Sequence, residues 1–90
     1  METTLDLLAR AMVDSPSSAE LCRALHVDRT TLAKARERGR LSPTLAGQLA
    51  ERLGEDPIRW IAAAALEAEP ASTAVQRLRR VLTKAGARLV

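Results

Sequence analysis

This chain contains no phenylalanine, no tyrosine, and only one tryptophan, one cysteine and one histidine among its 90 residues. A single cysteine excludes an internal disulfide, and with one histidine it cannot build a Cys- or His-rich metal site. No apolar run approaches the roughly 18 residues that a membrane-spanning helix needs. We therefore expect a protein without disulfide, metal or membrane segment, whose core is built from aliphatic side chains.

Residues that could perform catalysis are also scarce. The sequence has no glycine-rich phosphate-binding loop, and the acids Asp14, Glu20 and Glu37 are scattered without visible pairing. Nothing here assembles into a catalytic set, so we expect neither an enzyme nor a cofactor. The shortage of aromatic rings also argues against binding of RNA or single-stranded nucleic acid, because stacking on such rings supplies much of that binding energy.

What the chain does have is leucine and alanine in abundance, with few β-branched residues, which favours helix throughout. Apolar spacing and capping signals predict an all-α protein with helices over 5–13, 18–25, 29–36, 43–53, 57–66 and 73–85. We expect one domain over residues 1–69, followed by a C-terminal amphipathic basic helix within residues 70–90.

Residues 18–35 carry the most informative pattern. Ser17 and Glu20 stand three residues apart, the spacing of a capping box that begins a helix. The chain turns at residues 26–28, and Asp28 can cap a second short helix. The inward positions of that second helix are Leu32 and Ala35, and the outward ones are Arg29, Thr30, Ala33 and Lys34. A short helix braced by another, with basic and hydroxyl side chains outward, is typical of proteins that read the major groove of DNA.

The pattern resembles the helix-turn-helix of the lambda repressor/Cro class, which is common in phage and prophage regulators. The matching positions are Leu21, Cys22, Leu25, Val27 and Leu32, within a resemblance that extends over roughly residues 4–66. His26 stands where the family usually has glycine, often with positive φ, and Ala35 replaces a bulkier apolar residue. Histidine tolerates positive φ better than most non-glycine residues. The resemblance implies a lambda-repressor-like fold of five short helices around one leucine-rich core, with an additional C-terminal helix.

The resemblance also implies which side chains meet DNA. Base edges would be read by Arg29, Thr30 and Lys34, because arginine and lysine suit guanine while threonine suits the thymine methyl group. The implied backbone contacts, which position a protein without specifying sequence, are Ser18, Thr31, Arg36, Arg38 and Arg40. For each of these residues the alternative is an ordinary solvated surface position.

Charge is unevenly distributed along the chain, although the net value is only +3. Residues 20–40 have six Lys/Arg against three Asp/Glu, residues 41–69 have two against five, and residues 70–90 have five against none. Two basic segments separated by an acidic one indicate an oriented molecule with one side toward DNA.

The last two predicted helices indicate a second surface. The helix over 57–66 is apolar all round, so we expect other parts of the protein to pack against both of its sides. Its tryptophan lies on the side opposite the isoleucines. The helix over 73–85 has a short heptad-like apolar stripe. We expect a homodimer interface at Trp60, Ala64, Leu78 and Leu82. The final helix could instead cap the core, contact the DNA backbone or lie on a membrane surface.

Together these features predict a sequence-specific, double-stranded-DNA-binding transcriptional regulator. We expect a repressor that acts as a homodimer on an inverted repeat, in the bacterial cytoplasm on the nucleoid. The alternative is an antitoxin, anti-repressor or adaptor whose helix-turn-helix domain mainly binds another protein. The basic and hydroxylated outward face of the second helix in the motif favours DNA.

Overall fold

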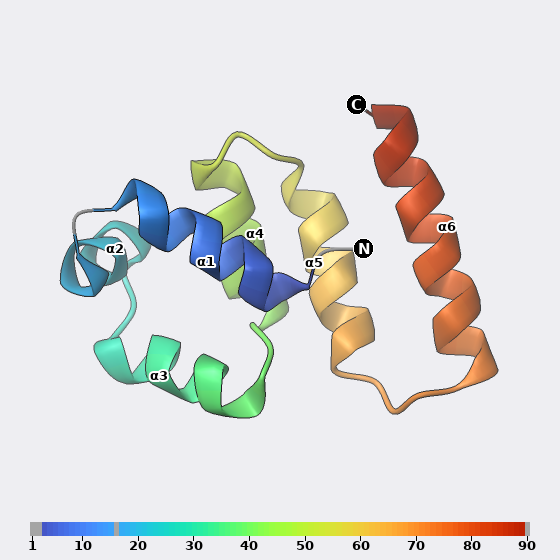
Figure 1. The fold of residues 1–90 in the computed structure, drawn as a ribbon, viewed down its shortest axis with the longest axis horizontal. Helices are drawn as coiled ribbons and strands as arrows, with labels where there is room; N and C mark the ends of the chain where they lie inside the picture. The colour runs from blue at the N-terminus through green and yellow to red at the C-terminus, as the bar shows by residue number, and fades with distance from the viewer. Residues whose placement is uncertain (1–2, 16, 90) are drawn as a thin grey trace.

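The computed structural model describes residues 3–15 and 17–89, with side chains up to residue 84, and within these ranges the regular secondary structure is entirely helical (Figure 1). The expected all-α class is thus confirmed. The helices are α1 (Thr4–Asp14), α2 (Ser18–Leu25), α3 (Arg29–Arg38), α4 (Pro43–Arg52), α5 (Pro57–Glu67) and α6 (Thr73–Leu89). In this part of the chain, no helix is both long enough and apolar enough to cross a membrane.

Most of the helices begin at residues whose side chains accept hydrogen bonds from the first turn. Thr3 accepts from the N–H of Asp6, and the Asp6 carboxylate accepts from the N–H of Thr3 at 2.8 Å, which completes a capping box. Asp28 occupies the N-cap position of α3, but its side chain makes no capping hydrogen bond, contrary to expectation. The other accepting residues are Ser17, Ser42, Asp56 and Ser72.

Two helices, α3 and α6, end two or more residues later than the sequence pattern predicts. α3 continues to Arg38 because the residue that turns the chain is Gly39, with φ +80°. The Gly39 N–H donates to the carbonyls of Ala35 and Arg36, which satisfies the end of the helix. α6 continues to Leu89, beyond the predicted end at residue 85.

The core lies among α1 to α5, with α6 against the outer side of α5 (Figure 1). α4 and α5 approach closely at Gly47, where a Cβ atom would lie only 2.9 Å from two side-chain carbons of Ile61. α6 is held by Val75, which is buried, and by Leu82, which packs against the core cluster. Leu82 therefore packs against the core of its own chain, which agrees with the alternative that this helix caps the core.

The placement of Trp60 and Ala64 at a dimer interface is wrong. Trp60 is only 2% exposed and Ala64 is fully buried, so neither side chain can reach a second subunit. Ile58 is instead the outward residue of α5, 76% exposed, and Ile61 is 41% exposed at the edge of the contact with α4. Both sides of α5 are apolar, so periodicity cannot tell which one is buried. Burial of the indole removes more apolar surface from water than burial of an isoleucine does, and its N–H finds a partner.

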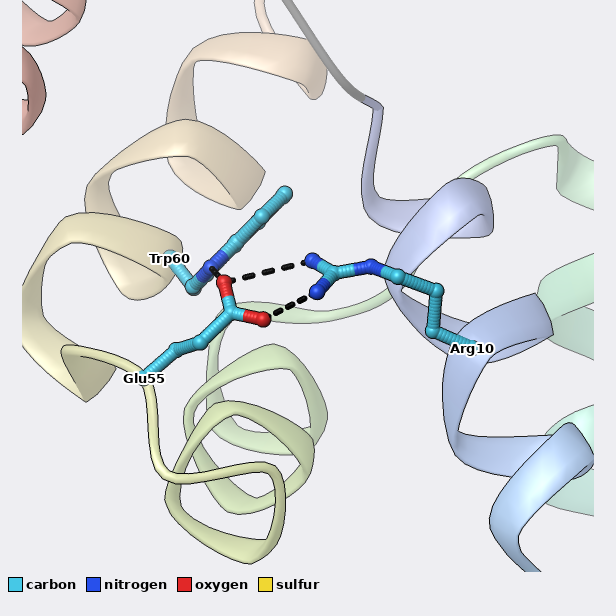
Figure 2. Close-up of polar contacts among 3 residues, drawn as sticks. All are labelled: Arg10, Glu55 and Trp60. Atoms are coloured by element: carbon cyan, nitrogen blue, oxygen red, sulfur yellow. Dashed lines mark hydrogen bonds and ion pairs between the residues drawn. The ribbon is translucent and has the colours of Figure 1, made fainter.

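The partner of Trp60 is Glu55, which also binds Arg10 of α1 (Figure 2). The indole N–H donates to Glu55 Oε1 at 3.0 Å, and both terminal nitrogens of the Arg10 guanidinium donate to the same carboxylate. The Arg10 guanidinium also lies 6.0 Å from the centre of the indole ring. These contacts join α1 to the loop before α5. The hydrogen bonds from Arg10, and secondarily that from Trp60, hold the pKa of Glu55 below its ordinary value.

This pKa predicts how stability changes with pH. Because the pKa of Glu55 is lower in the folded than in the unfolded state, its stabilising effect is complete above the unfolded value of about 4.3 and is lost as pH falls through the folded value. Glu55→Gln should cost about 1 kcal/mol at pH 7, since the pair is partly solvated. Urea unfolding measures the difference in the free energy of unfolding between the wild type and Glu55→Gln. This difference should decrease as the pH falls from 7 to 3. A constant difference across this range would contradict the prediction.

A second polar network is buried at the start of α1. Thr4 is fully buried, and its hydroxyl donates to the carboxylate of Glu67, at the end of α5. The Thr4 N–H donates to the other Glu67 oxygen at 2.9 Å. The Thr4 hydroxyl also accepts from the N–H of Leu41, at 2.9 Å. One side chain thus joins α1, α5 and the loop between α3 and α4.

Candidate nucleic-acid interface

The candidate site starts at the corner between α2 and α3. His26 ends α2 in the left-handed conformation, with φ 57°, and it is the non-glycine residue with positive φ in the described part of the chain. The N–H of Val27 donates to the carbonyl of Cys22 at 3.0 Å, which closes the turn. Gln48 of α4 donates to the carbonyl of Leu25 at 3.1 Å. The corner therefore adopts the positive φ expected at His26, and the Gln48 side chain binds the carbonyl group of the last residue of α2.

The structure confirms which side of α3 faces inward. Leu32 and Ala35 are buried in the core, whereas Arg29, Thr30 and Lys34 are exposed. α3 lies along one edge of the molecule, with its main packing against α2 (Figure 1). The three side chains expected to read bases thus share one solvent-facing surface.

The residues expected to contact the DNA backbone flank this surface. Arg36 and Arg38 are exposed in the last turn of α3, and Arg40 is half-buried just beyond it. Thr31 is half-buried in the first turn of the same helix. Ser18 is half-buried in the first turn of α2, where its hydroxyl lies 4.0 Å from the sulfur of Met12.

The cations on α3 are not held in ion pairs. Across residues 3–15 and 17–84, Arg29, Lys34 and Arg36 make no ion pair, so the Asp28 carboxylate is not in direct contact with its neighbour Arg29. Arg38 donates weakly to the backbone carbonyl of Lys34, at 3.5 Å. An exposed helix face with unpaired cations attracts polyanions and can neutralise phosphates.

A cleft of about 330 Å³ lies at the C-terminal end of α3, between this helix, α5 and α6. Its third arginine, Arg79, was not among the predicted site residues, because it borders the apolar stripe of α6 rather than the centre of the basic face of that helix. Its guanidinium donates to the carbonyl of Leu66 at 3.4 Å, which places it over the end of α5. The lining residues are Thr3, Arg38, Gly39, Arg40, Ala63, Glu67 and Arg79.

Other kinds of site find no support in the geometry. No three His, Cys, Asp or Glu side chains among the described residues are grouped so that they could hold a metal ion. Cys22 is buried as a free thiol, with its sulfur 3.8 Å from the carbonyl oxygen of Asp28. Comparison with known protein families, curated proteins and solved structures finds no match for this chain. Its candidate function therefore depends on the residues and geometry of α2, α3 and their surroundings.

Proposed function

We propose that this protein is a sequence-specific regulator of transcription that inserts α3 into the major groove of double-stranded DNA. The observation that carries the proposal is the division of α3 into two sides. Leu32 and Ala35 anchor it in the core, while Arg29, Thr30 and Lys34 are exposed together, and the two cations are free of ion pairs within the described residues. The proposal includes the lambda-repressor-like arrangement of helices that the sequence pattern resembles.

The chemistry of these side chains suits base edges. Arginine and lysine donate to guanine O6 and N7, and a threonine methyl packs against the methyl group of thymine. The flanking hydroxyls and guanidiniums, from Ser18 and Thr31 to Arg36, Arg38 and Arg40, suit phosphates and would set the orientation of α3 in the groove. An occupied promoter excludes the polymerase, so repression is the simplest outcome.

The protein acts as a homodimer on an inverted repeat in this proposal, with the two copies of α3 about 34 Å apart. Since Trp60 and Ala64 are internal, the interface requires other apolar residues. Ile58 on α5 and Leu78 and Val81 on α6 are exposed by 76%, 52% and 55%. Burying them against a second copy would remove this apolar surface from water. The same exposed residues favour the alternative function, an antitoxin, anti-repressor or adaptor that docks another protein there.

Selection of duplexes from a random-sequence library with the purified protein tests the proposal directly. We expect enrichment of a sequence with two-fold symmetry and half-sites one helical turn apart. A consensus without symmetry would contradict the homodimer. A library that shows no enrichment, even in dilute buffer, would contradict DNA recognition.

Arg29→Ala tests base reading within that selected sequence. We expect a loss of about 1–3 kcal/mol in binding, roughly 5- to 150-fold, and relaxed preference at one base position. Fluorescence anisotropy on selected and random duplexes measures both effects. Arg52→Ala is the matched control, because it removes the same charge from the exposed end of α4. An equal loss for Arg29→Ala on both duplexes would show that this residue contacts only the backbone.

A further inference from the structure

The cleft beside α3 brings together three arginines from two distant parts of the chain. Arg38 ends α3, Arg40 follows the turn at Gly39, and Arg79 comes from α6, far away in sequence. Its volume of about 330 Å³ is ample for a phosphate group. The apolar part of its lining is Ala63, which is buried on α5. The cleft is thus a concave surface lined by arginines from the end of α3 and from α6.

The single carboxylate in the lining does not cancel this charge. Glu67 is the acid among the lining residues, against the three arginines. Its two oxygens accept hydrogen bonds from the hydroxyl and N–H of Thr4, so they are directed toward the start of α1. The net charge of the lining is therefore positive, and guanidinium groups bind phosphate oxygens in a planar, two-pronged geometry.

We propose that this cleft binds a phosphate of the DNA backbone next to the groove that α3 reads, and that Arg79 thereby brings α6 into the DNA interface. The cleft lies directly at the C-terminal end of α3, and the end of α5 and the start of α6 lie on the same side of the molecule as α3 (Figure 1). A backbone strand leaving the groove would pass this position. The inference rests on the proposed function, since it names a further contact of the same interface.

The salt dependence of duplex binding tests the contact. Arg79→Gln should reduce the slope of log affinity against log salt by about 1 per protomer, and weaken binding about fivefold per protomer near 0.15 M salt. Arg80→Gln is the matched control, because it removes the same charge from the adjacent exposed position of α6, outside the lining of the cleft. Arg79→Lys keeps the charge and should keep most of the slope. Equal thermal midpoints would show that all three variants fold alike.

Inorganic phosphate provides a test that does not need DNA. In amide NMR spectra, titrated phosphate should shift the signals of Gly39 and Arg40 saturably in the wild type but not in Arg79→Gln. A slope that falls for Arg79→Gln and not for Arg80→Gln identifies the DNA backbone as the source of the phosphate. Duplex binding that depends on Arg29 but responds identically to the two glutamine variants would overturn the inference and leave the proposed function standing.

If the protein binds no duplex at all, the proposed function is wrong, and so is the inference that the phosphate in the cleft belongs to the DNA backbone. The phosphate titration then decides about the cleft by itself. If phosphate shifts these signals saturably in the wild type and not in Arg79→Gln, the cleft still binds phosphate, and its ligand would be a free phosphate compound. Absence of such shifts would overturn the site.

Discussion

Trp60→Ala should lower the free energy of unfolding by about 3–5 kcal/mol, because it removes the largest fully buried side chain of the core. Small domains are stable by only about 5–15 kcal/mol, so this loss brings the chain close to unfolding at moderate temperature. The thermal midpoint should fall by more than about 10 °C in circular dichroism. The variant also leaves Glu55 without its indole donor. Trp60→Phe, which keeps a ring but has no N–H, should cost less.

The control for this prediction lies on the same helix. Ile58→Ala changes a side chain that is 76% exposed, so its effect on unfolding should stay within about 0.5 kcal/mol. The loss for Trp60→Ala should also be independent of protein concentration, because the side chain packs within its own chain. A Trp60→Ala protein with unchanged stability but weakened self-association in ultracentrifugation would contradict the buried placement.

Thr4→Val should lower the free energy of unfolding by about 2–4 kcal/mol, although it hardly changes the volume of the side chain. The variant removes the hydroxyl that reaches both Glu67 and the N–H of Leu41. A buried N–H without an acceptor costs about 1–3 kcal/mol, and the hydrogen bond to a carboxylate adds to this. Urea unfolding at neutral pH measures the difference.

Two further variants separate the hydroxyl from the rest of the side chain. Thr4→Ser keeps both hydrogen bonds and should recover most of the stability. Thr44→Val makes the same chemical change at an exposed position in the first turn of α4, where the effect should stay within about 0.5 kcal/mol. A Thr4→Val protein as stable as Thr44→Val would show that the network contributes nothing.

Local signals in the sequence predicted the helices and the corner between α2 and α3. Caps such as Ser42 and Asp56, each followed by proline, act within one turn, so they can be recognised without knowledge of the fold. The positive φ at His26 was also expected, because the resemblance placed it where glycine is usual. The inward and outward sides of α3 followed from the polarity of its residues, since only one side is apolar.

The buried side of a helix could not be predicted where its two sides do not differ in polarity. α5 is apolar all round, so the pattern could not show that Trp60 is internal while Ile58 is exposed. The cleft residue Arg79 was missed for a related reason. Its position depends on how α6 lies against α5, and no periodicity within α6 encodes that orientation.

The amino-acid order alone determined the helical class, most helix limits and the polar surface of α3, because these depend on neighbours within a few residues along the chain. The tertiary structure decided which side of α5 is buried, and it brought Thr4 to Glu67 and Arg79 to the end of α3. These pairings join residues distant in sequence. They result from the competition of many side chains for a single small core, which is a property of the whole packed molecule.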